Sequence, residues 1–171
     1  MSPSRTSVAR RARTVANQHE SLRVWLRLLA CSNLVEGRVR SRLREEFDIT
    51  LPRFDVLAQL DAAARDDVHG LTMSELSRRL MVTNGNLTGL IERLVQEGLV
   101  SRAASATDRR TQIVRLSSTG RRALHVMAPQ HEQWIDELLV ELSADERAQL
   151  YALLGKLRDS IRHSISEETE T

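Results

Sequence analysis

Aromatic residues, prolines and glycines are all scarce in this 171-residue chain: aromatics make up 3% of it, and it has three prolines and seven glycines. With so few aromatic side chains, the core must be built mainly from Leu, Val and Ala, which favours helices. The length suits one domain, or one domain with an extension, and is sufficient to bury a core without disulfide cross-links.

Cysteine and long apolar runs are scarce as well. The single cysteine, Cys31, excludes an intramolecular disulfide framework and fits a reducing compartment. No stretch of about 18 apolar residues occurs, so we expect no membrane-spanning helix. Residues 1–14 lack the apolar segment of a secretory signal. The sequence therefore predicts a cytoplasmic protein with no membrane partner.

The net charge of +2 conceals a strong asymmetry along the chain. Residues 71–122 contain nine arginines against four acids, whereas residues 123–171 contain four basic residues against ten acids. Residues 1–19 contain four arginines and no acid, and we expect a disordered basic arm there. The excess of arginine in the middle of the chain predicts a surface for a negatively charged partner.

Apolar periodicity divides the chain into elements. Helical spacing predicts helices over residues 20–47, 51–65, 72–80, 83–97, about 118–139 and 143–163. After Gly98, a typical helix-terminating glycine, the spacing changes to alternation. Alternation predicts two short strands, at residues 99–102 and 112–117, joined by a hairpin tip at residues 103–110. Residues 164–171 form an acidic tail.

Capping signals support these boundaries. Thr72 with Glu75 predicts a capping box, and Leu71 faces Leu76 across it as a hydrophobic staple. Further N-caps are expected at Thr50, at Ser118 or Thr119, and at Ser143, where Glu146 completes a second capping box.

Two short helices joined by a tight turn and followed by a hairpin predict a winged helix-turn-helix. The fold class is therefore mainly α with a small β-hairpin. We expect a winged helix-turn-helix DNA-binding lobe at residues 50–122 and a helical dimerisation region formed by residues 20–47 and 123–163.

The helix over residues 83–97 is the candidate DNA-recognition helix. Its first half contains Asn, Thr and Gly residues, which are poor helix formers, so a purely structural helix gains little from them. Short polar side chains suit hydrogen bonding to base edges, and glycine allows close approach of the backbone to a duplex. Together with the surrounding arginines, the candidate DNA-binding residues are Ser74, Arg78, Arg79, Thr83, Asn84, Asn86, Thr88, Arg93, Arg102, Asp108, Arg109, Arg110 and Thr111.

Several alternatives stay open at this point. The helix is also compatible with a capped surface helix, each arginine with a solvated charge, and the whole lobe with a winged-helix module that binds protein. A redox or metal sensor would use Cys31 or the histidines, but the histidines are scattered and Cys31 lies among apolar residues, where inert core packing is expected. No phosphate-binding glycine loop, GxSxG elbow or HExxH motif occurs, so we expect no enzyme, cofactor or metal.

Long apolar stripes at residues 22–43 and 150–161 exceed what a small winged helix needs for its own core. They predict contact with a second copy of the chain, which would place two recognition helices about 34 Å apart on a pseudo-palindromic DNA site. The alternative is that both helices pack on their own domain.

The segment SELSRRLMVTNGNLTGLIERLVQEGLVSR, followed by DRRTQIVRLSSTG, resembles the MarR family of bacterial transcriptional regulators. The family pattern in the hairpin is Asp-x-Arg, alternating apolar residues, Leu-Thr and Gly. Here Asp108, Arg110, Leu116 and Gly120 match it, while Ser117 replaces the Thr and keeps the hydroxyl. The resemblance extends over about residues 20–163.

The resemblance implies a homodimer that binds double-stranded DNA, with wings in adjacent minor grooves and a small-molecule pocket between the dimerisation helices and the DNA-binding lobe. LPRFDVLAQL and RRLMVTNGNLTGLIERL are similar to a branch that represses genes of hydroxycinnamate and other aromatic-acid catabolism. It therefore implies a repressor released by a small aromatic effector, an aromatic acid or its coenzyme A thioester. The candidate ligand-binding residues are Arg23, Trp25, Arg27, Cys31, Arg53, Phe54 and Leu57.

Asp108 is an acid at the tip of a basic hairpin. We expect its carboxylate to hold Arg110 in place through a charge-assisted hydrogen bond, which lowers the entropy that the arginine loses on entering a minor groove. The alternative is an Asp that stabilises its own turn through the backbone.

Overall fold

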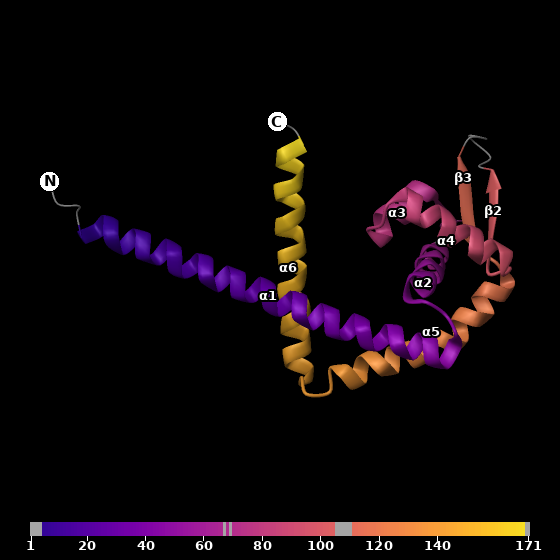
Figure 1. Ribbon diagram of the computed structural model, residues 1–171, viewed down its shortest axis with the longest axis horizontal. Coiled ribbons are helices and arrows are strands. Elements are labelled where there is room, and N and C mark those ends of the chain that lie inside the picture. Colours follow the sequence, from indigo (N-terminus) through magenta and orange to yellow (C-terminus); the bar gives the residue numbers. More distant parts are fainter. Residues whose placement is uncertain (1–4, 67, 69, 105–110, 170–171) are drawn as a thin grey trace. The chain divides into compact units, whose positions relative to one another are not determined.

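The computed structural model describes residues 5–66, 68, 70–104 and 111–169; side chains are described from residue 19 to residue 165 within these ranges. The chain divides into two compact units, Met1–His131 and Glu132–Thr171. The first contains α1 (Arg5–Phe47), α2 (Leu51–Arg65), α3 (Met73–Leu80), α4 (Asn84–Gln96), a small sheet and most of α5 (Ser118–Leu138). The second contains the end of α5 and α6 (Ala144–Thr169) (Figure 1).

The sheet has one strand more than the sequence predicted. Strands β2 (Val100–Ala104) and β3 (Gln112–Leu116) form the expected antiparallel hairpin, with Arg102 opposite Val114. A third strand, β1 (Leu71–Thr72), pairs antiparallel with β3 on its other side, giving the order β1-β3-β2. Two residues are too few to show alternation, which is why periodicity could not reveal this strand.

The first helix also differs from the prediction. α1 begins at Arg5, so the structure continues the helix through most of the segment expected to be a disordered arm. Residues 5–19 contain neither Pro nor Gly, and their Ala and Arg residues have high helix propensity, so nothing in the local sequence stops the helix.

The core of the first unit is aliphatic, as the composition requires. Leu71 and Leu76, the predicted staple, are both buried. Phe54, Leu57 and Leu60 form the expected inner face of α2. Of the apolar stripe expected on α4, Leu87, Ile91 and Leu94 are buried, whereas Leu90 is half-buried and Val95 is exposed. The buried hydrophobic residues are Val39, Leu43, Ile49, Phe54, Val56, Leu57, Leu60, Ala63, Leu71, Leu76, Leu87, Ile91, Leu94, Val100, Val114, Leu124 and Met127.

The first half of the described part of α1 and the whole apolar stripe of α6 are exposed. Leu22, Trp25 and Leu26 of α1 are each more than half exposed, and the apolar stripe of α6 is exposed along Leu150, Leu153, Leu154, Leu157 and Ile161. None of the described helices combines the length and apolar content that crossing a bilayer would require.

Candidate nucleic-acid interface

The helix-turn-helix begins at the predicted capping box. The backbone N–H of Thr72 donates to Glu75 Oε2 (2.8 Å), and the Glu75 N–H donates to Thr72 Oγ1 (3.1 Å). The Glu75 carboxylate accepts hydrogen bonds from both the N–H and the hydroxyl of Thr72, and these hold its pKa below the usual value. The box fixes the direction in which α3 leaves the sheet, because Thr72 is both the N-cap of α3 and the last residue of β1.

The turn between α3 and α4 is closed by hydrogen bonds between its ends. Met81 follows α3 in the left-handed conformation, with φ 55°. The Ser77 hydroxyl donates to the Val82 carbonyl, and the Val82 N–H donates back to the Ser77 carbonyl (3.1 Å). Thr83 then caps α4 by accepting a hydrogen bond from the Asn86 N–H (3.4 Å). α4 is thereby held in a defined orientation relative to α3.

α4 has one face in the core and one face open. Leu87, Ile91 and Leu94 are fully buried, whereas the side chains of Asn84 and Asn86 are exposed and, within the described part of the chain, make no hydrogen bond. The Thr88 hydroxyl, by contrast, donates to the Asn84 carbonyl (2.9 Å). The open face therefore presents two unengaged amide side chains.

The two glycines of α4 serve no packing purpose within the part of the chain that the structure describes. A Cβ atom added at Gly85 or Gly89 would meet nothing within 4 Å. A glycine costs a helix roughly 1 kcal/mol relative to alanine, and in α4 this cost brings no closer approach to any other element of the chain. The open side of α4 can instead be approached closely from outside.

A set of exposed arginines surrounds α4. Arg78 and Arg79 occupy the last turn of α3, Arg93 lies on α4 and Arg102 on β2. None of these four forms an ion pair among the described residues, although Arg78 and Arg79 act electrostatically on the Glu75 carboxylate. Ser74, in the first turn of α3, is exposed as well. The surface is thus rich in positive charge, and Arg93 and Arg102 form no ion pair among the described residues.

The wing formed by β2 and β3 is described only in part. Thr111 is half-buried and directly precedes β3. Asp108, Arg109 and Arg110 lie outside the described residues, so the contact expected between Asp108 and Arg110 stays a prediction.

The base of the wing is fastened by Ser117. Its hydroxyl donates to the Gly98 carbonyl (2.6 Å) and accepts from the Gly120 N–H (2.9 Å). Ser117, and not Ser118 or Thr119, therefore caps α5, and the retained hydroxyl ties α5 to the turn that follows α4. Gly120 lies so close to this turn that an added Cβ would be 2.0 Å from the Leu99 carbonyl oxygen.

The candidate ligand-binding residues do not come together in one chain. Phe54 and Leu57 are buried in the core, whereas Arg23, Trp25 and Arg27 are exposed on α1. Glu36 of α1 lies close enough to α2 to raise the pKa of Asp55. Arg23 precedes Glu36 on the same helix by roughly 20 Å, at about 1.5 Å per residue, so it lies far from the start of α2 along α1.

The position of Cys31 also differs from the sequence prediction of core packing. The thiol is exposed and is not packed in a core. The described residues also contain no group of three or more His, Cys, Asp or Glu side chains that could hold a metal ion.

Three contacts of α2 were missed by sequence reasoning. The Phe54 and His131 rings lie 4.7 Å apart, and burial lowers the pKa of His131. Burial and the nearby Glu36 raise the pKa of Asp55 to about 6. Arg53 forms an ion pair with Glu97. Each contact joins residues far apart in sequence, so no local pattern could have indicated it.

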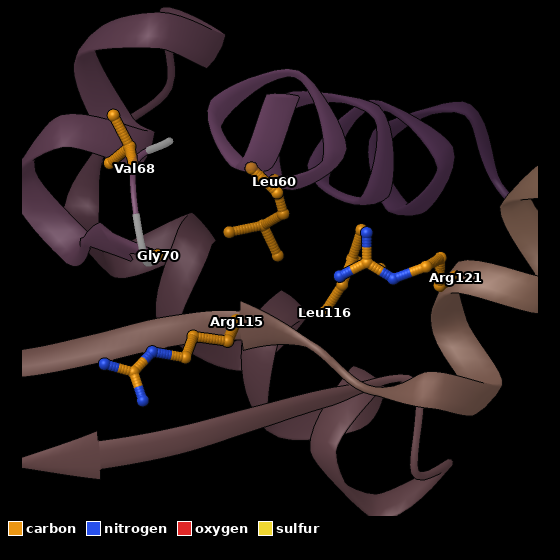
Figure 2. Close-up of a pocket in the computed structure, with 7 residues that line it drawn as sticks. Leu60, Val68, Gly70, Arg115, Leu116 and Arg121 are labelled. Atoms are coloured by element: carbon orange, nitrogen blue, oxygen red, sulfur yellow. The ribbon is translucent and has the colours of Figure 1, made fainter. Parts of the chain in front are cut away.

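A cavity of about 520 Å³ lies within the first unit, between α2, β3 and the start of α5. Figure 2 shows Leu60 projecting from α2 toward β3, with Arg115 and Arg121 on the opposite elements. Arg121 lies 3.8 Å from the Asp61 carboxylate. None of the candidate ligand-binding residues lines this cavity, whose lining is Leu60, Ala64, Val68, Gly70, Arg115, Leu116 and Arg121.

Comparisons with known proteins agree with this architecture. A sequence model of the MarR family matches residues 47–111. BadR of Rhodopseudomonas palustris, a transcriptional activatory protein, is 30% identical over 142 residues, which cover 82% of this chain and 79% of that protein.

Solved structures give the same result. A MarR family transcriptional regulator from Silicibacter pomeroyi is 32% identical and has a TM-score of 0.70 over 85% of this chain and 97% of its own. MepR from S. aureus, solved as a complex with DNA, is 26% identical and has a TM-score of 0.67 over 80% of this chain and 96% of its own. The chain belongs to the MarR family of winged-helix transcriptional regulators, which are DNA-binding proteins and not enzymes.

Proposed function

We propose that the protein is a ligand-responsive repressor that binds a pseudo-palindromic operator as a homodimer, with α4 in the major groove. The open face of α4 is the observation that carries this proposal. It combines unengaged Asn84 and Asn86 side chains with two glycines that pack against nothing inside the chain.

Asparagine on this face suits direct recognition of bases. An asparagine amide can donate to N7 and accept from N6 of the same adenine, which no other base pair matches in the major groove. Residues near the start of a recognition helix are those that contact base edges, and Asn84 and Asn86 lie in the first turn of α4. We therefore assign base recognition chiefly to these two residues.

The surrounding arginines suit phosphate contacts. Arg78, Arg79, Arg93 and Arg102 are exposed on the elements that flank or form the helix-turn-helix. Such contacts supply affinity without sequence preference and release counterions, so binding must weaken steeply as salt rises. We include Ser74, Thr83, Thr88, Thr111 and the wing residues Asp108, Arg109 and Arg110 in the same interface.

A second copy of the chain would cover the exposed apolar stripe of α6 and the exposed apolar residues of α1. Contiguous exposed apolar surface is rare on monomers, and two-fold association is the commonest way to bury it. We assign dimerisation to residues 20–47 and 123–163. The two recognition helices would then bind half-sites about one DNA turn apart.

We further propose that a small aromatic effector, an aromatic acid or its coenzyme A thioester, releases the protein from DNA. Sequence similarity to the aromatic-acid branch supports this part of the proposal. Because one chain does not assemble the candidate ligand-binding residues, we place the exposed α1 residues Arg23, Trp25, Arg27 and Cys31 against the start of the partner's α2, where Arg53 is half-buried, while Phe54 and Leu57 stay in the core. Aromatic acids and their thioesters should be screened for a rise in melting temperature, since tight binding to the native state must raise it.

Selection from a pool of random duplexes tests operator binding. The protein should enrich a two-fold symmetric sequence, and its affinity for the enriched duplex should fall steeply with salt. Asn86→Ala should lower that affinity roughly tenfold and relax the preference at one base pair of each half-site. Gln96→Ala, which alters an exposed residue at the other end of α4, is the matched control and should change neither property.

Failure to enrich any sequence, or an unchanged preference in Asn86→Ala, would remove operator recognition by α4. Repression is tested separately by transcription from a promoter that contains the selected sequence. Because the relative BadR is described as an activatory protein, an increase in transcript on adding the protein is the outcome that would contradict repression.

A further inference from the structure

We propose that Arg53 of α2 positions the recognition helix, by holding the C-terminal end of α4 through its ion pair with Glu97. This inference rests on the proposed use of α4 in base recognition, and it adds a residue that touches no DNA to the determinants of specificity.

The ion pair joins the start of one helix to the end of another. Arg53 is the third residue of α2, and Glu97 is the C-cap of α4. The guanidinium of Arg53 contacts Glu97 Oε2, with the Arg53 side chain only 19% exposed and that of Glu97 40% exposed. Both residues belong to the first compact unit. The contact therefore links α2, a core helix, directly to the helix that faces DNA.

Neither charge suits its own helix. The N-terminus of a helix carries partial positive charge, so an arginine in the first turn of α2 is unfavourable there. The same position in a capping box is occupied by Glu, and α2 has no side-chain hydrogen bond at its cap residue Thr50. Glu97 is equally misplaced, because the C-terminus of α4 carries partial negative charge. Each charge is compensated by the other helix, so the pair is explained only by the contact between them.

The burial of Arg53 supports the same conclusion. Its Nε atom is buried and, within the described part of the chain, has no hydrogen-bond partner. A buried donor without a partner is destabilising, so this position of the Arg53 side chain carries a cost. Arg53 therefore destabilises the helix to which it belongs, and the contact of its guanidinium with Glu97 of α4 is the interaction that offsets this.

The ion pair with Arg53 gives α4 a directional contact, which its apolar face does not provide. Leu87, Ile91 and Leu94 anchor the helix in the core, but apolar contacts are non-directional. A guanidinium–carboxylate contact is directional and fixes the tilt of the helix end. Asn84 and Asn86 lie at the opposite end of α4, so a small change in tilt displaces their amides relative to a base edge.

Charge reversal tests this role in the full-length protein, with the duplex that the wild type enriches from a random pool and an unselected duplex as probes. Arg53→Glu places Glu where α2 favours it but opposite Glu97, which repels it. We expect Arg53→Glu to bind the selected duplex about tenfold more weakly than the wild type does. On the unselected duplex, its affinity should differ less than about twofold from that of the control variant Arg65→Glu. Arg65 is a suitable control because it lies on the same helix, is 77% exposed and pairs within α2 with Asp61.

The double variant Arg53→Glu/Glu97→Arg restores the pair with each charge favourable to its own helix. We expect it to regain most of the affinity for the selected duplex and to melt at or above the wild-type temperature. Glu97→Arg alone should bind the selected duplex less tightly than the double variant, because two arginines then face each other.

Undiminished binding by Arg53→Glu, no recovery in the double variant, or equal binding by Glu97→Arg alone would overturn the role of Arg53. If the wild type enriches no sequence at all, operator recognition fails instead, and the two failures are thus distinguishable. Melting temperatures of all variants identify any loss of binding that is only a loss of fold.

Discussion

Helices α4 and α6 are both amphipathic, but only α4 has its apolar face filled by its own chain. Leu87, Ile91 and Leu94 of α4 are 0% exposed, whereas Leu150, Leu154 and Leu157 of α6 are each about 40% exposed. The same sequence pattern thus produces a finished core in one helix and an open surface in the other. Apolar periodicity shows which face a helix will bury, and the tertiary structure decides whether the chain itself supplies the partner.

The largest expected effect comes from placing a charge on the exposed apolar face of α6. In a two-fold dimer each substitution occurs twice, and an unpaired buried carboxylate costs about 3 kcal/mol per site, so Leu157→Glu should weaken association by about 6 kcal/mol. Light scattering should then give the mass of one chain at concentrations where the wild type gives two. Ala152→Glu, on an exposed position of the same helix, serves as the control and should stay dimeric. A Leu157→Glu protein of unchanged mass would contradict dimerisation through α6.

A substitution on the buried apolar face of α4 should instead change the stability of the fold. Ile91→Ala removes a side chain with 0% exposure and should lower the free energy of unfolding by about 3 kcal/mol, through lost burial and a residual cavity. Urea denaturation at a fixed protein concentration measures this loss. Val95→Ala on the same helix, where the side chain is 38% exposed, should cost less than about 1 kcal/mol. Equal losses in the two variants would mean that the two faces of α4 are not distinguished by burial.

The smallest expected effect concerns carboxyl groups in the two regions. Asp55 lies in the first compact unit, and burial together with Glu36 raises its pKa from 3.8 to about 6. Folding therefore favours its protonated form, and its contribution to stability is present below about pH 4 and is lost as pH rises to about 6. Since Asp55 is only partly buried, we expect a loss of about 1 kcal/mol.

Asp55→Asn should abolish this decline, so the difference in unfolding free energy between wild type and variant should change between pH 4 and pH 6 and be constant above. On α6, hydrogen bonds from Ser143 lower the pKa of Glu146, so Glu146→Gln should show the opposite sign, with the advantage of the wild type lost as pH falls. A wild-type advantage over Asp55→Asn that does not vary with pH would contradict the raised pKa.

Sequence alone was sufficient for the elements that depend on local signals. The Thr72 and Ser143 capping boxes, the glycine stop at Gly98 (φ 69°) and the buried face of α2 were predicted and are confirmed. The buried face of α4 is confirmed except for Val95, which is exposed. These features depend on residues within one or two helical turns of each other, where spacing determines contact.

Features that depend on tertiary packing could not be predicted in this way. Strand β1 exists only because β3 pairs with it, and Ser117 caps α5 while also binding the turn after α4. Thr50 has the position of an N-cap but no capping hydrogen bond from its side chain. For the site, sequence identified the polar face of α4, but the link between Arg53 and Glu97 became visible only when both helices were in place.

The contact between Gly120 and Leu99 has a consequence for how this sequence can diverge. An added Cβ at position 120 would overlap a backbone carbonyl oxygen, which cannot move aside as a flexible side chain can. Gly155 on α6 and Gly37 on α1 meet nothing within 4 Å and carry no such restriction. Across descendants of this chain, position 120 should therefore stay glycine while positions 37 and 155 drift, so an alignment of its orthologues would record where the base of the wing touches α5.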